Sequence, residues 1–338
     1  MTALPMVIAE VSANHNGGLE RAVELIRVAA DSGATAVKFQ HYTPATITVR
    51  SEHPDFRVGG GTLWDGRELA DLYAEAATPW EWTPTLVGAA EAAGIQWLSS
   101  VFDETSVDFL EGFACPSYKI ASFEIVDLPL IAHAAATGRP MLISTGMASE
   151  QEIDDAVRTA HDAGAAQVTL LRCNSAYPAV VSQMDLRAIP VMAERWGVPV
   201  GLSDHTLGHV AAVTATALGA QVIEKHLILS RSDGGPDAAF SAEPAEFAAL
   251  VAAVRDAHAA LGSARFGPSP GERASLAFRP SLRAVRDISV GEVFTADNIA
   301  SIRPAGGLPP ARFSEVCGMP ARRPFRPGDP IMEEDCRH

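Results

Sequence analysis

Short apolar runs alternate with longer, alanine-rich amphipathic segments over the first 264 residues of the chain. Runs of this length, bounded by polar residues, are typical of buried β-strands. Residues 19–32 and 150–163 instead repeat their apolar positions at helical spacing, and Gly33 and Gly164 follow them as helix-ending glycines. The pattern predicts strands at residues 6–11, 34–39, 95–100, 117–121, 141–144, 167–171, 198–202 and 220–224.

Eight strand–helix units in about 250 residues are the size of a TIM (β/α)8 barrel. A doubly wound open sheet is the alternative, but the first unit does not open with the Gly-x-Gly-x-x-Gly motif common in that fold. We therefore predict an α/β TIM barrel for residues 1–264. Residues 41–80 are too many for a plain connection, which indicates a lid or a substrate loop.

The pattern changes after a Pro/Gly-rich stretch, 266–272, which we take as part of a linker over residues 265–280. Residues 281–338 contain short strand-like runs separated by turn residues, which predicts a small, mostly β domain with almost no helix. Net charge changes at the same place, from −17 before Arg265 to +2 from Arg265 onward.

The charge balance and the cysteines limit the classes of function. A net charge of −15 and a pI of about 5.1 argue against a nucleic-acid surface and against binding to anionic membranes. The uncharged tract at 206–223 is rich in Ala, Thr and Gly, so a buried helix and strand explain it better than a membrane span. Four cysteines without Cys-x-x-Cys spacing fit a reducing cytoplasm.

Two histidines mark the candidate active site. His205 and His226 each follow a predicted strand, with one helix-length segment between them. In a parallel β-α-β unit, both imidazoles reach the same mouth, where Ser203, Asp204 and Glu224 stand beside them. Such a pair can hold a divalent metal, although a single histidine at a strand end is more often a hydrogen-bonded core residue.

Polar residues also end the other predicted strands, which core packing alone does not explain. The residues at these strand ends are Glu10, Asn14, His15, Asn16, Lys38, Gln40, Ser100, Asp103, Lys119, Ser122, Glu124, Ser144, Thr145, Asn174, Ser175 and Tyr177.

The chain has only three lysines, Lys38, Lys119 and Lys225, against 23 arginines, and each lies in or at the end of a predicted barrel strand. A compact ammonium suits phosphate or carboxylate binding in a narrow pocket, so we predict a ligand role for Lys38 and Lys119. The alternative is that each is a structural ion-pair partner. We favour that alternative for Lys225, because strand alternation turns it away from Glu224 and His226.

At these residues the sequence resembles the sialic acid synthase family, over essentially its full length. The wording of residues 78–82, 121–124 and 175–178 favours the pseudaminic acid branch, and the tail, including 302–304, resembles the antifreeze-like (SAF) domain of these enzymes. The matching motifs are AEVSANHNG at 9–17, AVKFQ at 36–40, TPWEW at 78–82, YKIASFE at 118–124, ISTGM at 143–147, SAYP at 175–178, GLSDHT at 201–206, IEKH at 223–226 and DAAFSAEP at 237–244.

The resemblance implies a condensation of phosphoenolpyruvate with an open-chain acylamino sugar, giving a nine-carbon 2-keto acid and phosphate. It implies that His205 and His226 bind Mn²⁺ or Mg²⁺, which polarises the sugar aldehyde, and that Glu124 activates the attacking water. It also implies a domain-swapped homodimer in which Arg303 reaches the partner's barrel. The resemblance implies that phosphoenolpyruvate is bound by Lys38, Lys119, Ser122, Ser144, Ser175 and Ser203. It implies that the sugar is positioned by Glu10, Gln40, Tyr177 and Asp237.

Two alternatives stay open at this point. Within the family, the sugar could lead to N-acetylneuraminic or legionaminic acid, because residues 41–80 are expected to set the sugar contacts. Outside enzymes, the tail could serve a non-catalytic carbohydrate or ice-surface binder, although the polar barrel rim argues against this.

Overall fold

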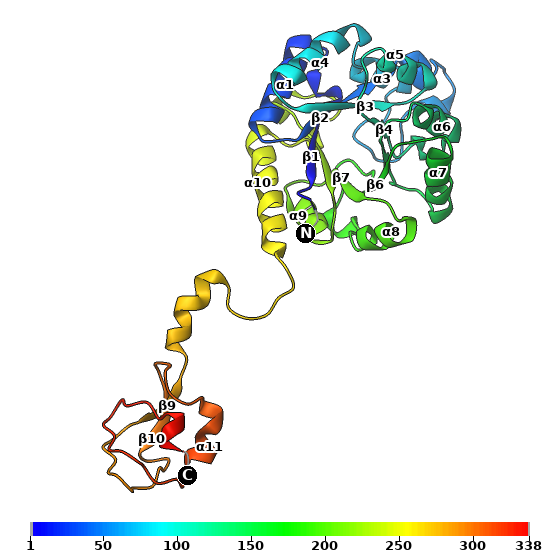
Figure 1. Cartoon of the computed structure of the whole chain (residues 1–338). Coiled ribbons are helices and arrows are strands. Elements are labelled where there is room, and N and C mark those ends of the chain that lie inside the picture. The colour runs from blue at the N-terminus through cyan, green and yellow to red at the C-terminus, as the bar shows by residue number, and fades with distance from the viewer. Residues whose placement is uncertain (1–2, 337–338) are drawn as a thin grey trace. The chain divides into compact units, whose positions relative to one another are not determined.

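The chain folds as two compact units that divide after Ser263. The computed structural model describes residues 3–336. Each unit has its own hydrophobic core, and the larger unit holds the barrel (Figure 1).

Eight parallel strands close into a barrel, which confirms the predicted TIM-barrel class. The closing pair is β1 with β8, in a register that sets Glu10 opposite His226. The strands are β1 (Met6–Glu10), β2 (Ala36–His41), β3 (Gln96–Val101), β4 (Tyr118–Ile120), β5 (Met141–Ser144), β6 (Val168–Cys173), β7 (Val200–Asp204) and β8 (Val222–His226).

Helices surround the barrel and bury the outward face of its strands (Figure 1). Among residues 3–336, no helix is long and apolar enough to cross a membrane. The helices of this unit are α1 (Leu19–Asp31), α2 (Pro44–Ile47), α3 (Leu69–Ala76), α4 (Thr83–Ala92), α5 (Glu104–Glu111), α6 (Leu128–Ala136), α7 (Glu150–Asp162), α8 (Ala188–Trp196), α9 (Val210–Ala217) and α10 (Pro244–Leu261).

The barrel interior changes from apolar to polar along the strands. Toward the start of the strands it is filled by a buried apolar cluster. Further along the strands, the inward positions are polar; they are Glu10, Lys38, Ser100, Ser203 and Glu224. All five polar side chains are buried, so the polar end of the barrel is part of its packed interior. The apolar cluster consists of Ile8, Ala36, Leu98, Leu142, Leu171 and Val222.

Four strands run two residues further than the sequence predicts. Strands β2, β6, β7 and β8 end at His41, Cys173, Asp204 and His226, where their predicted ends were residues 39, 171, 202 and 224. An apolar-run criterion stops at the first polar residue, but these residues still pair with neighbouring strands. Part of the site's polar groups therefore lie on the strands themselves, and the rest lie in the loops that follow the strands.

Between β2 and α4 the chain makes the long excursion that the sequence indicated. It contains α2, α3 and a hairpin in which the backbone N–H of Val58 donates a hydrogen bond of 2.8 Å to the carbonyl oxygen of Arg67, beside an Arg57–Glu68 bridge. The Asp65 carboxylate accepts hydrogen bonds of 2.8 Å from the backbone N–H groups of Gly61 and Thr62, which fixes the hairpin tip.

The second unit is small and mostly irregular, with one antiparallel pair, β9 (Ser281–Ala284) and β10 (Ile299–Ile302), and a short helix, α11 (Phe313–Val316). Its core includes Leu282, Phe294 and Phe325. A 3-10 helix at Pro270–Phe278, capped by Ser269, lies where the sequence predicted a linker.

Barrel packing leads to a stability prediction. A Cβ at Gly201 on β7 would meet the carbonyl oxygen of Val222 at 2.5 Å and a Leu171 methyl at 2.7 Å. We expect Gly201→Ala to destabilise the fold by about 1–3 kcal/mol through overpacking, measured as a lower midpoint of thermal unfolding. Gly88→Ala on α4 is the control, because nothing lies within 4 Å of its Cβ; it should raise the midpoint. An unchanged midpoint for Gly201→Ala would contradict the prediction.

Candidate active site

Two buried ammonium groups and two buried carboxylates face each other at the polar end of the barrel. Lys38 on β2 forms an ion pair with Glu10 on β1, and its Nζ lies 3.6 Å from Glu224 on β8. Lys119 on β4 lies 3.5 Å from the same Glu224 oxygen, which also accepts a 3.1 Å hydrogen bond from Ser203. Residues from four different strands thus converge on one ion cluster.

Burial and neighbouring charges oppose each other within this cluster. Burial raises the pKa of Glu10 to about 7, even though Lys38 lowers it. Against the effect of burial, Glu10 and Glu224 raise the pKa of Lys38. Burial lowers the pKa of Lys119, because Glu224 compensates it only in part. The second oxygen of Glu224 is buried without a hydrogen-bond partner, which leaves a polar group available to a ligand.

The two histidines lie together, with ring centroids 5.5 Å apart. The Nδ1–H of His205 donates to the carbonyl oxygen of Asn174 at 2.9 Å, which orients the ring and leaves Nε2 as the nitrogen available to a metal. Nδ1 of His226 is buried without a hydrogen-bond partner and lies 3.7 Å from an Asp237 oxygen. Phe240 packs edge-on against both rings.

This donor set fits a divalent metal with two protein ligands. Burial lowers the pKa of His226 well below its usual value, so its imidazole is neutral, as a metal ligand must be. Within residues 3–336, no three His, Cys, Asp or Glu side chains converge to form a closed metal site. A metal held by His205 and His226 would therefore keep positions open for water or substrate.

Hydroxyl groups line the side of the mouth formed by β5 and the loops after β4 and β6. Ser122 Oγ accepts a 3.1 Å hydrogen bond from the backbone N–H of Gly146, and a Cβ at Gly146 would overlap both the Ser122 and Ser175 hydroxyl oxygens. The hydroxyl of Ser144, at the end of β5, is buried without a hydrogen-bond partner. Such a group requires a ligand or water to satisfy it.

Three more predicted residues border the same mouth. The Tyr177 ring centroid lies 4.4 Å from that of His205. Gln40 donates a hydrogen bond of 3.2 Å to Glu10 from the end of β2. Burial raises the pKa of Glu124 to about 7, and Lys119 is the cation near enough to lower it. The structure therefore brings these three residues to the same mouth as the ion cluster and the histidine pair.

Arg303 is the exception, since it lies in the second unit, where its side chain is exposed. Arg283 holds the backbone next to it, donating hydrogen bonds to the carbonyl oxygens of Pro304 and Ala305 at 3.0 and 2.7 Å.

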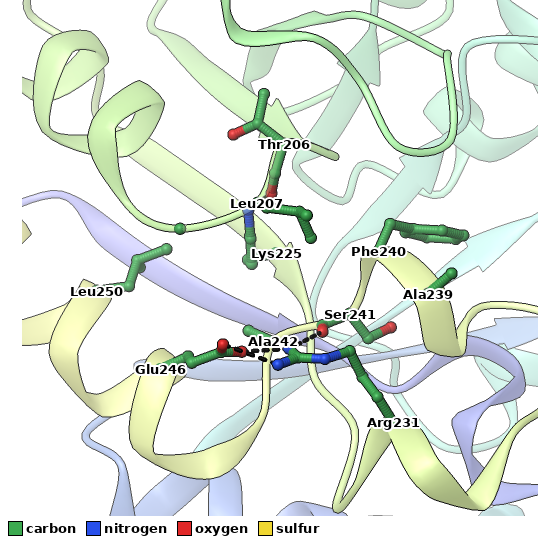
Figure 2. A pocket seen from close by; sticks show the side chains of 11 residues that line it. Thr206, Leu207, Lys225, Arg231, Ala239, Phe240, Ser241, Ala242, Glu246 and Leu250 are labelled. Carbon is green, nitrogen blue, oxygen red and sulfur yellow. Dashed lines mark hydrogen bonds and ion pairs between the residues drawn. The ribbon is translucent and has the colours of Figure 1, made fainter.

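Lys225 is a structural ion-pair partner, as strand alternation indicated. Its Nζ lies 2.8 Å from Asp204 on the outward face of the barrel, so Asp204 is not beside the histidine pair as the sequence suggested. Lys225 borders a cavity of about 150 Å³, where Arg231 pairs with Glu246 (Figure 2). Because both cations of this cavity are already paired, it offers no free positive charge for a phosphorylated substrate.

The sequence analysis missed two side chains at the mouth. Phe240 follows Asp237 in a 3-10 turn and could have been inferred from that spacing. Trp64, on the excursion hairpin, contacts Tyr177 with ring centroids 5.4 Å apart. No local pattern links two residues so distant in sequence.

Comparison with known proteins agrees with this geometry. The NeuB family model matches residues 25–266, and the SAF domain model matches residues 279–337. The chain is 40% identical to pseudaminic acid synthase of Campylobacter jejuni, covering 98% of this chain and 96% of that protein. It is 35% identical to N,N'-diacetyllegionaminic acid synthase of Legionella pneumophila, covering 92% and 89%.

Among solved structures, the chain is similar to N-acetylneuraminic acid (sialic acid) synthetase of Leptospira borgpetersenii in complex with citrate. The TM-score is 0.72 at 30% identity, covering 81% of this chain and 90% of that one. The family match, the near-full-length identity and the fold agree with the resemblance found in the motifs: the chain belongs to the NeuB family of sialic acid synthases and carries a SAF domain.

Proposed function

We propose that this chain condenses phosphoenolpyruvate with open-chain 2,4-diacetamido-2,4,6-trideoxy-L-altrose and water to give pseudaminic acid and phosphate. The observation that carries the proposal is its near-full-length identity to a pseudaminic acid synthase, which exceeds its identity to a legionaminic acid synthase. The buried ion cluster beside the histidine pair supplies the chemistry that this reaction needs.

Phosphoenolpyruvate would bind between the two lysines and the serine hydroxyls. Lys38 and Lys119 provide compact cations, and the partnerless Ser144 hydroxyl provides a donor in the same polar layer. The hydroxyl groups of Ser122 and Ser175 both lie against Gly146, so both could donate hydrogen bonds to one phosphate. Ser203, which bonds to Glu224, completes the set.

The sugar would lie on the histidine side of the mouth. His205 and His226 would hold a divalent metal, Mn²⁺ or Mg²⁺, which when bound acts as a Lewis acid toward the aldehyde oxygen. Glu10, Gln40 and Asp237 are hydrogen-bonding groups for its hydroxyl and amide groups. Tyr177 would orient it by contact with its phenol ring.

The reaction would form one C–C bond and replace the phosphate oxygen on C2 with an oxygen from water. C3 of phosphoenolpyruvate attacks the aldehyde carbon of the sugar, whose oxygen takes up a proton, and C2 becomes cationic. Water adds to C2, giving up a proton to Glu124, and the tetrahedral intermediate expels phosphate by cleavage of the C2–O bond. A carboxyl with a pKa of about 7 can act as this base near neutral pH.

We also propose a division of labour in which residues 1–264 carry the chemistry, 265–280 link the units, and 281–338 provide Arg303 to the partner's barrel in a domain-swapped homodimer. Support comes from exposed apolar side chains on successive loops at the barrel mouth, which suit a covered surface. These residues are Phe123, Met147, Val180, Val181 and Leu207.

Four free cysteines fit a cytoplasmic location.

The substrate assignment is tested by phosphate release from phosphoenolpyruvate with each candidate sugar. We expect the diacetamido-trideoxy-altrose to give the highest kcat/KM and the formation of a nine-carbon keto acid, detected by mass. Turnover with N-acetylmannosamine or the legionaminic precursor alone would contradict the choice of sugar. Ice affinity without turnover of any sugar would contradict an enzymatic function.

The metal proposal is tested by chelation. Removing divalent ions should abolish turnover, and Mn²⁺ should restore it, because the aldehyde then regains its Lewis acid. His226→Ala should lower kcat/KM about 100-fold or more and weaken Mn²⁺ binding measured by calorimetry. His161→Ala, on the exposed surface of α7, is the matched control. Full activity of the chelated enzyme would overturn this role.

The raised pKa of Glu124 leads to a prediction about how kcat depends on pH. Because its pKa is raised to about 7, the carboxylate forms as the pH rises through 7, so kcat should rise over the same interval. Glu124→Gln should lower kcat about 100-fold or more and remove that rising limb, whereas Glu91→Gln on α4 should change neither. A variant that keeps both the rate and the limb would exclude Glu124 as the base.

A further inference from the structure

The tip of the excursion hairpin reaches across the mouth of the barrel. The Trp64 indole N–H donates a 2.9 Å hydrogen bond to the carbonyl oxygen of Pro236, in the loop after β8 and 172 positions away in sequence. The same ring contacts Tyr177, which in turn contacts His205. Trp64 is therefore joined to the histidine pair through one intervening ring.

A cavity of about 420 Å³ lies between this hairpin and the loop after β6. Its size is within the range of small-molecule sites. Because Tyr177 lines the cavity and also contacts His205, the cavity adjoins the reacting end of the mouth. The apolar part of its lining is formed by Leu63, Trp64, Ala176 and Pro178, and the hydroxyl groups come from Thr62, Ser175 and Tyr177.

This lining matches one end of the proposed sugar better than it matches the same end of N-acetylmannosamine. A 6-deoxy carbon and an acetamido methyl group are apolar, and the amide needs only a few hydrogen bonds. N-acetylmannosamine carries hydroxyl groups at C4 and C6 instead, which would lose hydrogen bonds against Leu63 and Trp64. The exposed Leu63 side chain, 50% accessible on the hairpin, gains a partner when a methyl group fills the cavity.

We propose that this cavity is the subsite for the end of the acceptor sugar remote from its aldehyde, and that Trp64 is a specificity-determining residue. The inference rests on the proposed function, because it assumes that the acceptor is an acylamino sugar. It adds to that function a selection for a deoxy, acetamido-bearing end, made by the excursion between β2 and α4.

The test compares Trp64→Ala and Trp64→Phe with the wild type, using both the diacetamido-trideoxy-altrose and N-acetylmannosamine. Trp64→Ala should lower kcat/KM for the first sugar about tenfold or more, the effect of losing a methyl-sized contact, while the KM for phosphoenolpyruvate changes less than about twofold. The preference for the first sugar over the second should shrink. Trp64→Phe keeps a ring and should retain most of the preference.

Trp196→Phe is the matched control, because its indole bonds to Asp154 on the outer helices and lines no part of the cavity. An unchanged sugar preference in Trp64→Ala, or an equal rise in KM for phosphoenolpyruvate, would overturn the inference. A wild type that uses only another acylamino sugar would refute the proposed substrate instead. In that case, a rise in KM for that sugar alone in Trp64→Ala would support the subsite, and an unchanged KM would contradict it.

Discussion

The structure depends on the mutual compensation of two lysines and two glutamates buried inside a closed barrel. A lone charge buried in such an interior would cost several kcal/mol. Removing one lysine or glutamate of the cluster would leave the opposite charge of its partner uncompensated. Glu224 is central, because it lies 3.6 Å from Lys38 and 3.5 Å from Lys119. The apolar cluster nearer the start of the strands excludes water from below, so these interactions act in a region of low dielectric.

The same cluster explains how an anionic substrate could enter a buried site. Its carboxylates balance its lysines before any ligand binds, and Glu10 has a pKa raised to about 7 by burial. Uptake of one proton near neutral pH therefore needs little free energy and would free Lys38 for a phosphate or carboxylate group. The partnerless oxygen of Glu224 and the hydroxyl of Ser144 remain to be satisfied by ligand or water.

In this unit, rigid strands carry one part of the site and the long excursion between β2 and α4 carries another. The ion cluster and His226 lie on strands, where pairing on both sides fixes them to the register of the barrel, and His205 directly follows β7. Trp64 comes from a hairpin, held by Pro236 and by an Asp65 turn. Loops tolerate sequence change better than strands do, so a sugar preference located there can vary while the condensation chemistry stays the same.

The sequence by itself determined the barrel, because repeated apolar runs and helix-ending glycines depend only on local order, and it located the polar ends of the strands. It also separated Lys225 from the other lysines by strand alternation. Only the tertiary structure decided that β2, β6, β7 and β8 extend two residues past their predicted ends, that Asp204 faces outward to Lys225, and that Trp64 contacts Tyr177. Those outcomes depend on which strands and loops become neighbours on closure, which no local pattern of hydrophobic and polar positions records.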